Sequence, residues 1–305
     1  MNQKKETVLI VLAFFAIYVI WGSTYLLNKI AVAELPPFML AGIRFFIAGV
    51  LVFFVAWALG KNLSITKKQL LNVSFVGFLF LSLGNGLAVW ALQYLDSGIA
   101  ALEISAQPLV ILLMMLVLQG KKIQPMSMIG VVLGMVGIYL LVGQQQILES
   151  ENAILGIILI AGCMLSWGYG SIFVSKADLP KNYFVNTAYQ MVIAGVFLMI
   201  MSLVIGETWS NPIHWSYEIQ WVMVLLVVFG SIVAFTSFNY LLKKVSPEKV
   251  ATSTYVNPIV ALVLGWYFLD EQITVQSLVA AAILLTGVYF INTKRKLHFN
   301  WRLGR

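Results

Sequence analysis

The sequence predicts an all-α integral membrane protein of ten transmembrane helices, arranged as two inverted five-helix repeats. Three observations support this prediction: the composition, an even number of apolar segments joined by loops of alternating charge, and an internal repeat. Of the 305 residues, 61% are hydrophobic and only 10% are charged, whereas soluble domains carry about 25% charged residues. So few charges cannot cover a soluble surface, and the same composition excludes a disordered chain.

Ten apolar segments are each long enough to cross a bilayer, which takes roughly 20 residues. They fall at about 8–32, 38–59, 70–91, 97–118, 126–143, 153–175, 184–206, 220–242, 247–269 and 273–292. Ten such spans use about two thirds of the chain and leave only short loops. The sequence therefore has no room for a soluble catalytic domain.

The loops alternate in charge from one end of the chain to the other. The N-terminus and every second loop carry lysine or arginine, and the loops between them carry aspartate or glutamate. Of the 19 basic residues, all except Lys29 and Arg44 fall on one side of the predicted topology. Because basic loops stay in the cytoplasm, we expect a multi-pass protein of the cell (inner) membrane with both termini in the cytoplasm.

The second half of the sequence repeats features of the first. An offset of 150 residues aligns Pro108 with Pro258 and Gly137 with Gly287, and Trp21-Gly22 is echoed by Trp167-Gly168. A unit of five spans is odd, so the second unit must enter the membrane from the opposite side. Inverted repeats of this kind are typical of secondary transporters. We expect one repeat over residues 1–147 and an inverted second repeat, with a basic cytoplasmic tail, over 148–305.

Several stretches resemble the EamA family of the drug/metabolite transporter superfamily. They are Trp21-Gly22-Ser23-Thr24, Pro36-Pro37, Arg44-Phe45, the run from Trp90 to Pro108, Gly134 to Tyr139, and Lys249 to Pro258. The resemblance implies ten helices in two inverted repeats and a central cavity lined mainly by spans 1, 3, 4, 6, 8 and 9. It also implies export of small metabolites, amino acids or drug-like compounds. Glu103 stands where the second repeat has Ser253, so an acid at this position is not assumed for the whole family.

Three ionisable residues lie inside predicted spans: Lys29, Arg44 and Glu103. A charge at the bilayer centre costs at least about 2.5–3.5 kcal/mol, so it normally finds a partner or faces a cavity. All three lie roughly 8–9 Å below the outer boundary, which predicts a cluster with surplus positive charge that could receive a substrate carboxylate or couple transport to an ion. Alternatively, Lys29 snorkels to the interface, Arg44 pairs with Glu103 or with helix carbonyls, and Glu103 is only a counter-ion.

Polar and aromatic residues near the midplane form a second group of candidates. Together with Glu103, the predicted substrate-binding residues are Trp21, Ser23, Asn85, Gln107, Trp167, Tyr255 and Asn257. The tryptophans would supply flat walls for a ligand, or they only pack. Gln107 and Asn257 precede helix prolines that free a backbone carbonyl, so these two amides either repair the backbone or contact substrate.

These features favour a secondary transporter that exports small organic metabolites, amino acids or drug-like compounds, across the inner membrane by alternating access. The alternatives are a facilitative, channel-like uniporter and an intramembrane enzyme. We expect no catalytic residues, no cofactor and no metal, because no P-loop, nucleophile–base pair or metal triad is visible. The expected partners are a small-molecule substrate and the lipid bilayer, with no nucleic acid. Glycines at 130, 134 and 137 predict close helix packing, either between the repeats or in a homodimer, so the protein is a monomer or a homodimer.

The predicted topology can be tested by cysteine labelling in a variant in which Cys163 is replaced. Single cysteines at Gln146 and Ser210 should react with an impermeant thiol reagent added outside the cell, because their loops are predicted to be external. Cysteines at Asn62 and Asn182 should stay unlabelled until the membrane is opened. The reverse pattern would contradict both the topology and the inverted repeat.

Overall fold

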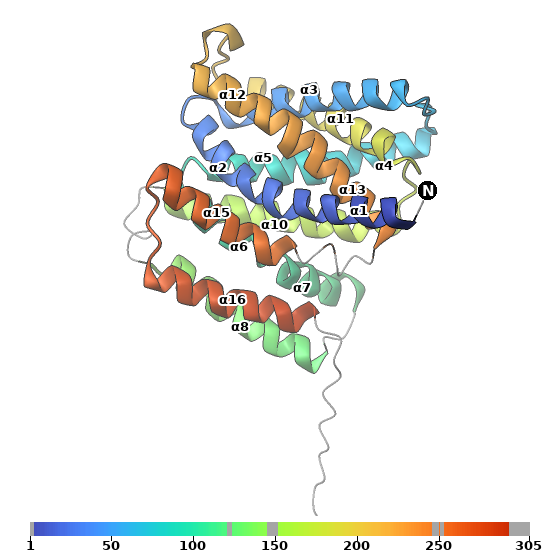
Figure 1. Ribbon diagram of the computed structural model, residues 1–305. Helices are drawn as coiled ribbons and strands as arrows, with labels where there is room; N and C mark the ends of the chain where they lie inside the picture. Colours follow the sequence, from blue (N-terminus) through green and yellow to red (C-terminus); the bar gives the residue numbers. More distant parts are fainter. Residues whose placement is uncertain (1–2, 121–123, 145–151, 246–249, 251–252, 293–305) are drawn as a thin grey trace, which may run out of the picture.

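The computed structural model is all-helical over the residues that it describes, which are 3–120, 124–144, 152–245, 250 and 253–292 (Figure 1). Eight helical spans in this part of the chain are long and apolar enough to cross a membrane, and two shorter apolar helices follow at Tyr255–Leu269 and Val275–Ile291. The ten predicted helices are confirmed.

Several spans consist of more than one helical segment. In chain order they are α1 (Gln3–Phe15), η1 (Ala16–Ile20) and α2 (Trp21–Val32); α3 (Pro37–Ala58); α4 (Lys67–Gly77), η2 (Phe78–Asn85) and α5 (Gly86–Ala91); α6 (Ser97–Ile104) and α7 (Gln107–Gln119); α8 (Pro125–Val142); α10 (Ala153–Val174); α11 (Tyr183–Val204); α12 (Tyr217–Leu225), η4 (Leu226–Val233) and α13 (Ala234–Lys244); α15 (Ser253–Leu269); and α16 (Val275–Asn292). A short 3₁₀ turn, η3 (Pro212–His214), precedes α12.

The helices begin and break where local chemistry requires it. The third span starts earlier than predicted because Thr66 and Gln69 form a capping box, in which each side chain accepts a hydrogen bond from the other's backbone N–H. The fourth span breaks between α6 and α7, just before Pro108, whose ring cannot continue the helical hydrogen bonding. Pro258 instead lies inside α15.

Three spans contain π-helical segments, which are frequent at functional sites. The segment η1 lies in the first span, and η2 and η4 lie in the third and eighth. The last two are both eight residues long and are separated by 148 residues at each end, Phe78 to Leu226 and Asn85 to Val233. The third and eighth spans thus share an unusual backbone feature at equivalent places.

Close glycine contacts relate the two halves by a pseudo-two-fold axis. Where α3 packs on α11, a β-carbon added at Gly195 would lie 2.5 Å from the backbone N of Phe46, and one added at Gly49 would lie 2.6 Å from the N of Val192. Residues 49 and 195, and likewise 46 and 192, differ by the same 146 positions as Trp21 and Trp167. Each contact is therefore the symmetry mate of the other.

The pair formed by α8 and α16 repeats this pattern at the other flank of the bundle (Figure 1). A β-carbon at Gly137 would lie 2.9 Å from Leu284 N, and one at Gly287 would lie 2.8 Å from Gly134 N. The glycine stripe of α8 therefore packs between the two halves of one chain. The boundary predicted between residues 147 and 148 lies outside the described residues and stays a prediction.

Carboxylates join the two halves at one end of the bundle. We call the end at which α1 begins the N-terminal face, and the other end the opposite face. On the opposite face, Glu207 accepts hydrogen bonds from the N–H groups of Phe38 (3.0 Å) and Met39 (2.8 Å) at the start of α3. Glu271 likewise binds Ser97 N (2.7 Å) and Gly98 N (3.1 Å) at the start of α6. Negative side chains are favourable at helix N-termini because the macrodipole is positive there.

The N-terminal face is joined differently. Lys244, the last residue of α13, forms an ion pair of 2.7 Å with Glu6 in α1. The Glu6 carboxylate raises the pKa of Lys244 through this hydrogen bond and its charge. Both side chains keep more than a third of their surface exposed, so the pair contributes little to stability and chiefly marks where the first and eighth spans meet.

The glycine contacts can be tested by adding a single methyl group. Gly195→Ala should lower the free energy of unfolding by roughly 1–3 kcal/mol, because the new β-carbon would collide with the backbone of α3. Gly162→Ala is the matched control, since its β-carbon would meet only the flexible end of Leu87 at 3.1 Å. That variant should gain up to about 0.5–1 kcal/mol of helix propensity. Equal effects in a detergent unfolding assay would argue against the close packing.

Candidate functional site

Aromatic rings fill the centre of the bundle, around the pseudo-two-fold axis. The symmetry-related Trp21 and Trp167 meet edge to face, with ring centroids 6.1 Å apart. Trp167 stacks on Phe80 at 4.4 Å, and Trp21 also contacts Phe235 and Phe238. We call these five rings the aromatic cluster. Two predicted candidates, from the first and sixth spans, are thus brought together at the boundary between the halves.

The two amides that precede helix prolines bind backbone carbonyls of facing helices. Gln107 Nε2 donates to Met164 O in α10 at 3.0 Å. In the amide orientation that satisfies both side-chain atoms, Asn257 Nδ2 donates to Tyr18 O at 2.9 Å in η1. Met164 and Tyr18 are themselves equivalent at the offset of 146, so the two contacts are symmetry mates. Each amide thus joins its helix to a carbonyl of a neighbouring helix, and its contact with substrate stays a prediction.

Ser23 and Tyr255 contribute less to this region. Ser23 Oγ donates to Ile20 O in its own span at 2.7 Å, so its hydroxyl is occupied locally. Tyr255 is half-buried and packs against the apolar core between the first and fourth spans. Neither residue is part of the aromatic cluster.

Lys29 reaches from the first span to the turn that follows the third span. Its ammonium group donates to the carbonyl oxygens of Leu92 (2.9 Å) and Leu95 (2.8 Å), just beyond the end of α5. A cation is favourable at this position because the last carbonyls of a helix are unpaired and carry the negative end of the macrodipole. Lys29 therefore ties the first span to the end of the third.

Arg44 is almost completely buried, with 1% of its surface exposed, and its partners are neutral. Its Nε donates to Ser231 Oγ in η4 at 2.7 Å, and its Nη1 donates to Asn28 Oδ1 in α2 at 3.1 Å. The guanidinium carbon also lies 4.8 Å from the centroid of the Phe45 ring. Arg44 thus bridges three spans across the two halves.

Glu103 is the third member of the predicted charge cluster, and the structure does not bring it together with the other two. No ion pair joins Glu103 to Lys29 or to Arg44, all three of which lie in the described part of the chain. Equal depth was the basis of the prediction, but each cation is directed toward a different neighbouring helix. The prediction of one cluster is therefore corrected to three separate environments.

Glu103 and Asn85 each have a side-chain oxygen that lacks a hydrogen-bond partner among the described residues. Glu103 is 3% exposed, and the unpartnered atoms are its Oε2 and Asn85 Oδ1. Glu103 lies on α6, which begins at the opposite face and packs against α2 and α10. These are the helices that carry Trp21 and Trp167.

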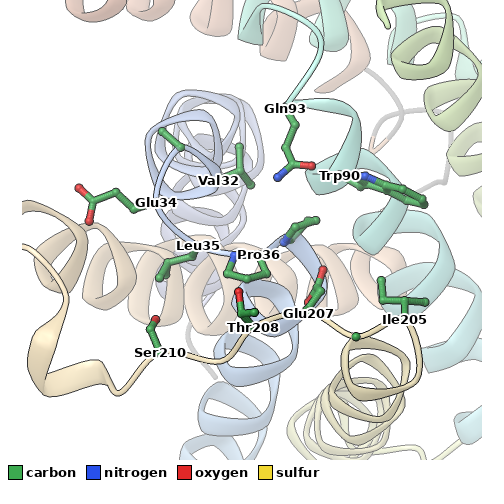
Figure 2. Close-up of a pocket in the computed structure, with 13 residues that line it drawn as sticks. Val32, Glu34, Leu35, Pro36, Trp90, Gln93, Ile205, Glu207, Thr208 and Ser210 are labelled. Atoms are coloured by element: carbon green, nitrogen blue, oxygen red, sulfur yellow. The ribbon is translucent and has the colours of Figure 1, made fainter.

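A pocket of about 560 Å³ opens on the opposite face. It lies between the end of the first span, the start of α3, the end of α5 and the connection that begins at Ile205. Figure 2 shows the Gln93 amide directed into this pocket, opposite Pro36, while the Glu34 carboxylate points away from its centre. Glu207, which binds the N–H groups at the start of α3, also lines this pocket. The pocket forms a recess in the opposite face of the bundle.

Sequence reasoning missed the groups that hold the charged residues. Asn28 and Ser231 bind Arg44, and neither lies in a motif that marks it. A weak signal was available for Asn28, because an amide inside an apolar span needs a partner. Gln93 and the rest of the opposite-face pocket lie in loops and helix ends, where no periodic pattern distinguishes one polar residue from another.

The sequence matches the EamA-like transporter family over residues 8–143 and again over 154–293. Escherichia coli K12 has a similar protein, the uncharacterized inner membrane transporter YedA, with 34% identity over 286 residues that cover 93% of this chain and 91% of the relative. The uncharacterized transporter YoaV of Bacillus subtilis is 25% identical, covering 93% of this chain and 96% of that protein.

A third relative, a probable amino-acid metabolite efflux pump of Escherichia coli K12, is 24% identical and covers 94% of each chain. A solved crystal structure shares the fold with a TM-score of 0.66 and 18% identity, covering 93% of this chain and 96% of that one. The relatives' names are those of transporters, not of enzymes. With the apolar helices, they identify a multi-pass protein of the inner membrane.

The environment of Arg44 can be tested by double-mutant cycles in a detergent unfolding assay. Arg44→Gln and Ser231→Ala should be coupled by about 1 kcal/mol, the size of a hydrogen bond between transmembrane helices. Arg44→Gln and Glu103→Gln should add to within about 0.3–0.5 kcal/mol, because the two side chains share no contact. A larger coupling energy between Arg44 and Glu103 would instead support the ion pair predicted from the sequence.

Proposed function

Because this chain belongs to the EamA-like transporter family, we propose that it is a secondary transporter that exports small organic metabolites, amino acids among them, across the inner membrane by alternating access. The observation that carries the proposal is that two buried polar atoms, Glu103 Oε2 and Asn85 Oδ1, have no hydrogen-bond partner among the described residues, in the half of the bundle that faces the pocket. Buried polar groups are normally satisfied, so we infer that a substrate supplies hydrogen-bond donors here, or that Glu103 takes up a proton.

The arrangement of the two halves supports alternating access. The symmetry-related contacts of α3 with α11 and of α8 with α16 give each half an equivalent surface on the other, and inverted repeats permit rocking about a fixed site. The Glu207 and Glu271 contacts cross between the halves on the opposite face only. Opening that face would break them, and opening the N-terminal face would leave them intact.

The orientation follows from charge. The described lysines in loops and at the ends of helices lie at the N-terminal face, among them Lys61, Lys67, Lys176 and Lys181. Cytoplasmic loops of membrane proteins carry the excess of basic residues. We therefore place the N-terminal face in the cytoplasm and the pocket on the outer side, where an exported substrate would leave.

Glu103 is the residue that we assign to coupling. It is the carboxylate buried within the spans, and Lys29 and Arg44 are bonded elsewhere, so no described cation neutralises it through an ion pair. A buried carboxyl in this setting exchanges a proton when its surroundings change during the cycle. Substrate movement past the neighbouring tryptophan pair would supply that change.

Glu103→Gln tests this assignment in proteoliposomes loaded with labelled amino acids. The variant keeps the shape of the side chain but cannot release a proton, so transport driven by a pH gradient should be abolished. Exchange of substrate at equal pH on both sides should persist, because it requires no net proton movement.

Glu218→Gln serves as the control, because it removes an exposed acid at the start of α12. It should leave both assays unchanged. Normal gradient-driven transport by Glu103→Gln would contradict the coupling role and favour a uniporter. No flux of any tested metabolite through the unmodified protein, in either assay, would contradict the transport function itself.

A further inference from the structure

A second group of unpartnered polar atoms lies apart from Glu103 and Asn85. Six buried side-chain atoms in the described residues have no hydrogen-bond partner, and four of them belong to two neighbouring helices, α11 and α13 (Figure 1). These four atoms are Asn186 Oδ1, Gln190 Oε1, Thr236 Oγ1 and Tyr240 Oη. We call the residues that carry them the amide cluster.

Two hydrogen bonds fix the position of the cluster. Asn186 Nδ2 donates to Asn239 Oδ1 at 3.3 Å, and Asn239 Nδ2 donates to Thr187 Oγ1 at 2.9 Å. Asn239 therefore uses both ends of its amide, whereas Asn186 is left with its oxygen free. Because successive spans run in opposite directions, Gln190 and Thr236 each lie one turn further into the bundle than this pair.

The free atoms specify what the cluster can bind. An amide oxygen only accepts hydrogen bonds, and a hydroxyl can accept as well as donate. Asn186 and Gln190 are both more than nine-tenths buried, and an amide oxygen left without a donor in an apolar environment costs free energy. The matching ligand therefore carries several N–H or O–H donors within a small volume.

The surroundings favour a positively charged donor. The ring of Tyr240 meets that of Tyr183 with centroids 5.6 Å apart, and tyrosine faces attract cations. Lys244, one turn beyond Tyr240, is paired with Glu6, so its charge is partly compensated. A primary ammonium group supplies three N–H donors from one atom, which suits the two accept-only amide oxygens of α11 and the hydroxyl oxygens of α13, which can accept as well.

We propose that the amide cluster binds the primary ammonium group of a small organic amine at the N-terminal face, before the amine reaches the aromatic cluster. Phe235 and Phe238 of that cluster lie on the same helix as Thr236 and Asn239, so the two sites adjoin. The proposal names a substrate class, an amine that includes amino acids, and in that respect it rests on the proposed function.

The test measures binding to the purified full-length protein in detergent, without transport. Propylammonium chloride should raise the thermal unfolding temperature, because a ligand that binds only the folded state stabilises it. Tetramethylammonium chloride at the same concentration should not, since it carries the charge but no N–H donor. Equal stabilisation by the two salts, or none by propylammonium, would overturn the proposal.

Two variants place the binding at the cluster. Gln190→Met and Thr236→Val each replace an unpartnered oxygen at nearly constant volume and should weaken propylammonium binding about tenfold. Thr286→Val is the matched control, because Thr286 is exposed and its hydroxyl donates to Ala282 O in its own helix at 2.6 Å. That variant should bind as the unmodified protein does.

The unfolding temperatures of the variants without ligand distinguish a loss of ligand binding from a loss of folding. If the oxygens await a ligand, Gln190→Met and Thr236→Val should unfold at the same temperature as the unmodified protein or higher. Lower unfolding temperatures with an unchanged response to propylammonium would instead assign the cluster to structural water and refute the amine site. Unchanged propylammonium binding in both variants, with an unmodified protein that transports, would overturn this site alone. Binding by a protein that moves no metabolite would overturn only the proposed function.

Discussion

A polar group inside the hydrocarbon of a membrane has no water to bind, so it must find its partner within the protein. This constraint explains the helical backbone and most of the side-chain contacts between spans. The amides Gln107 and Asn257 bind carbonyls of facing helices, and Lys29 binds the carbonyls beyond the end of α5. Arg44 is held by a hydroxyl and an amide from two other spans. The charged residues inside this bundle are thus chiefly connectors between helices.

Against this background the unsatisfied groups are informative. Those of Glu103 and Asn85 lie toward the opposite face, and those of the amide cluster lie on α11 and α13, where Thr236 stands between Phe235 and Phe238 of the aromatic cluster. The amine site that we propose therefore adjoins the aromatic cluster, in which the symmetry-related Trp21 and Trp167 meet.

The two-fold relation between the halves gives this order a mechanical basis. Glycine contacts let the backbones of α3 and α11, and of α8 and α16, approach closely, and each contact has a symmetry mate in the other half. The polar connections are less symmetric. Carboxylates from second-half loops clamp first-half helices at the opposite face, whereas the N-terminal face has the exposed pair of Glu6 and Lys244. The two faces therefore differ in what must break when the halves move.

The membrane setting, the number of spans and the inverted repeat could be predicted from the sequence, because these features follow from local properties. A helix in hydrocarbon satisfies its own backbone, so composition and length are enough to predict it. The sequence also marked Trp21 with Trp167, and Gln107 with Asn257, as equivalent positions, which the structure places in symmetry-related contacts. Which side chains meet could not be predicted in this way, because it depends on how the helices pack. Lys29, Arg44 and Glu103 share a depth, but depth is one coordinate, and the rotation of each helix about its own axis is fixed by packing against its neighbours. That rotation directs Arg44 to Ser231 and Lys29 to the end of α5, and it leaves Glu103 without an ionic partner among the described residues.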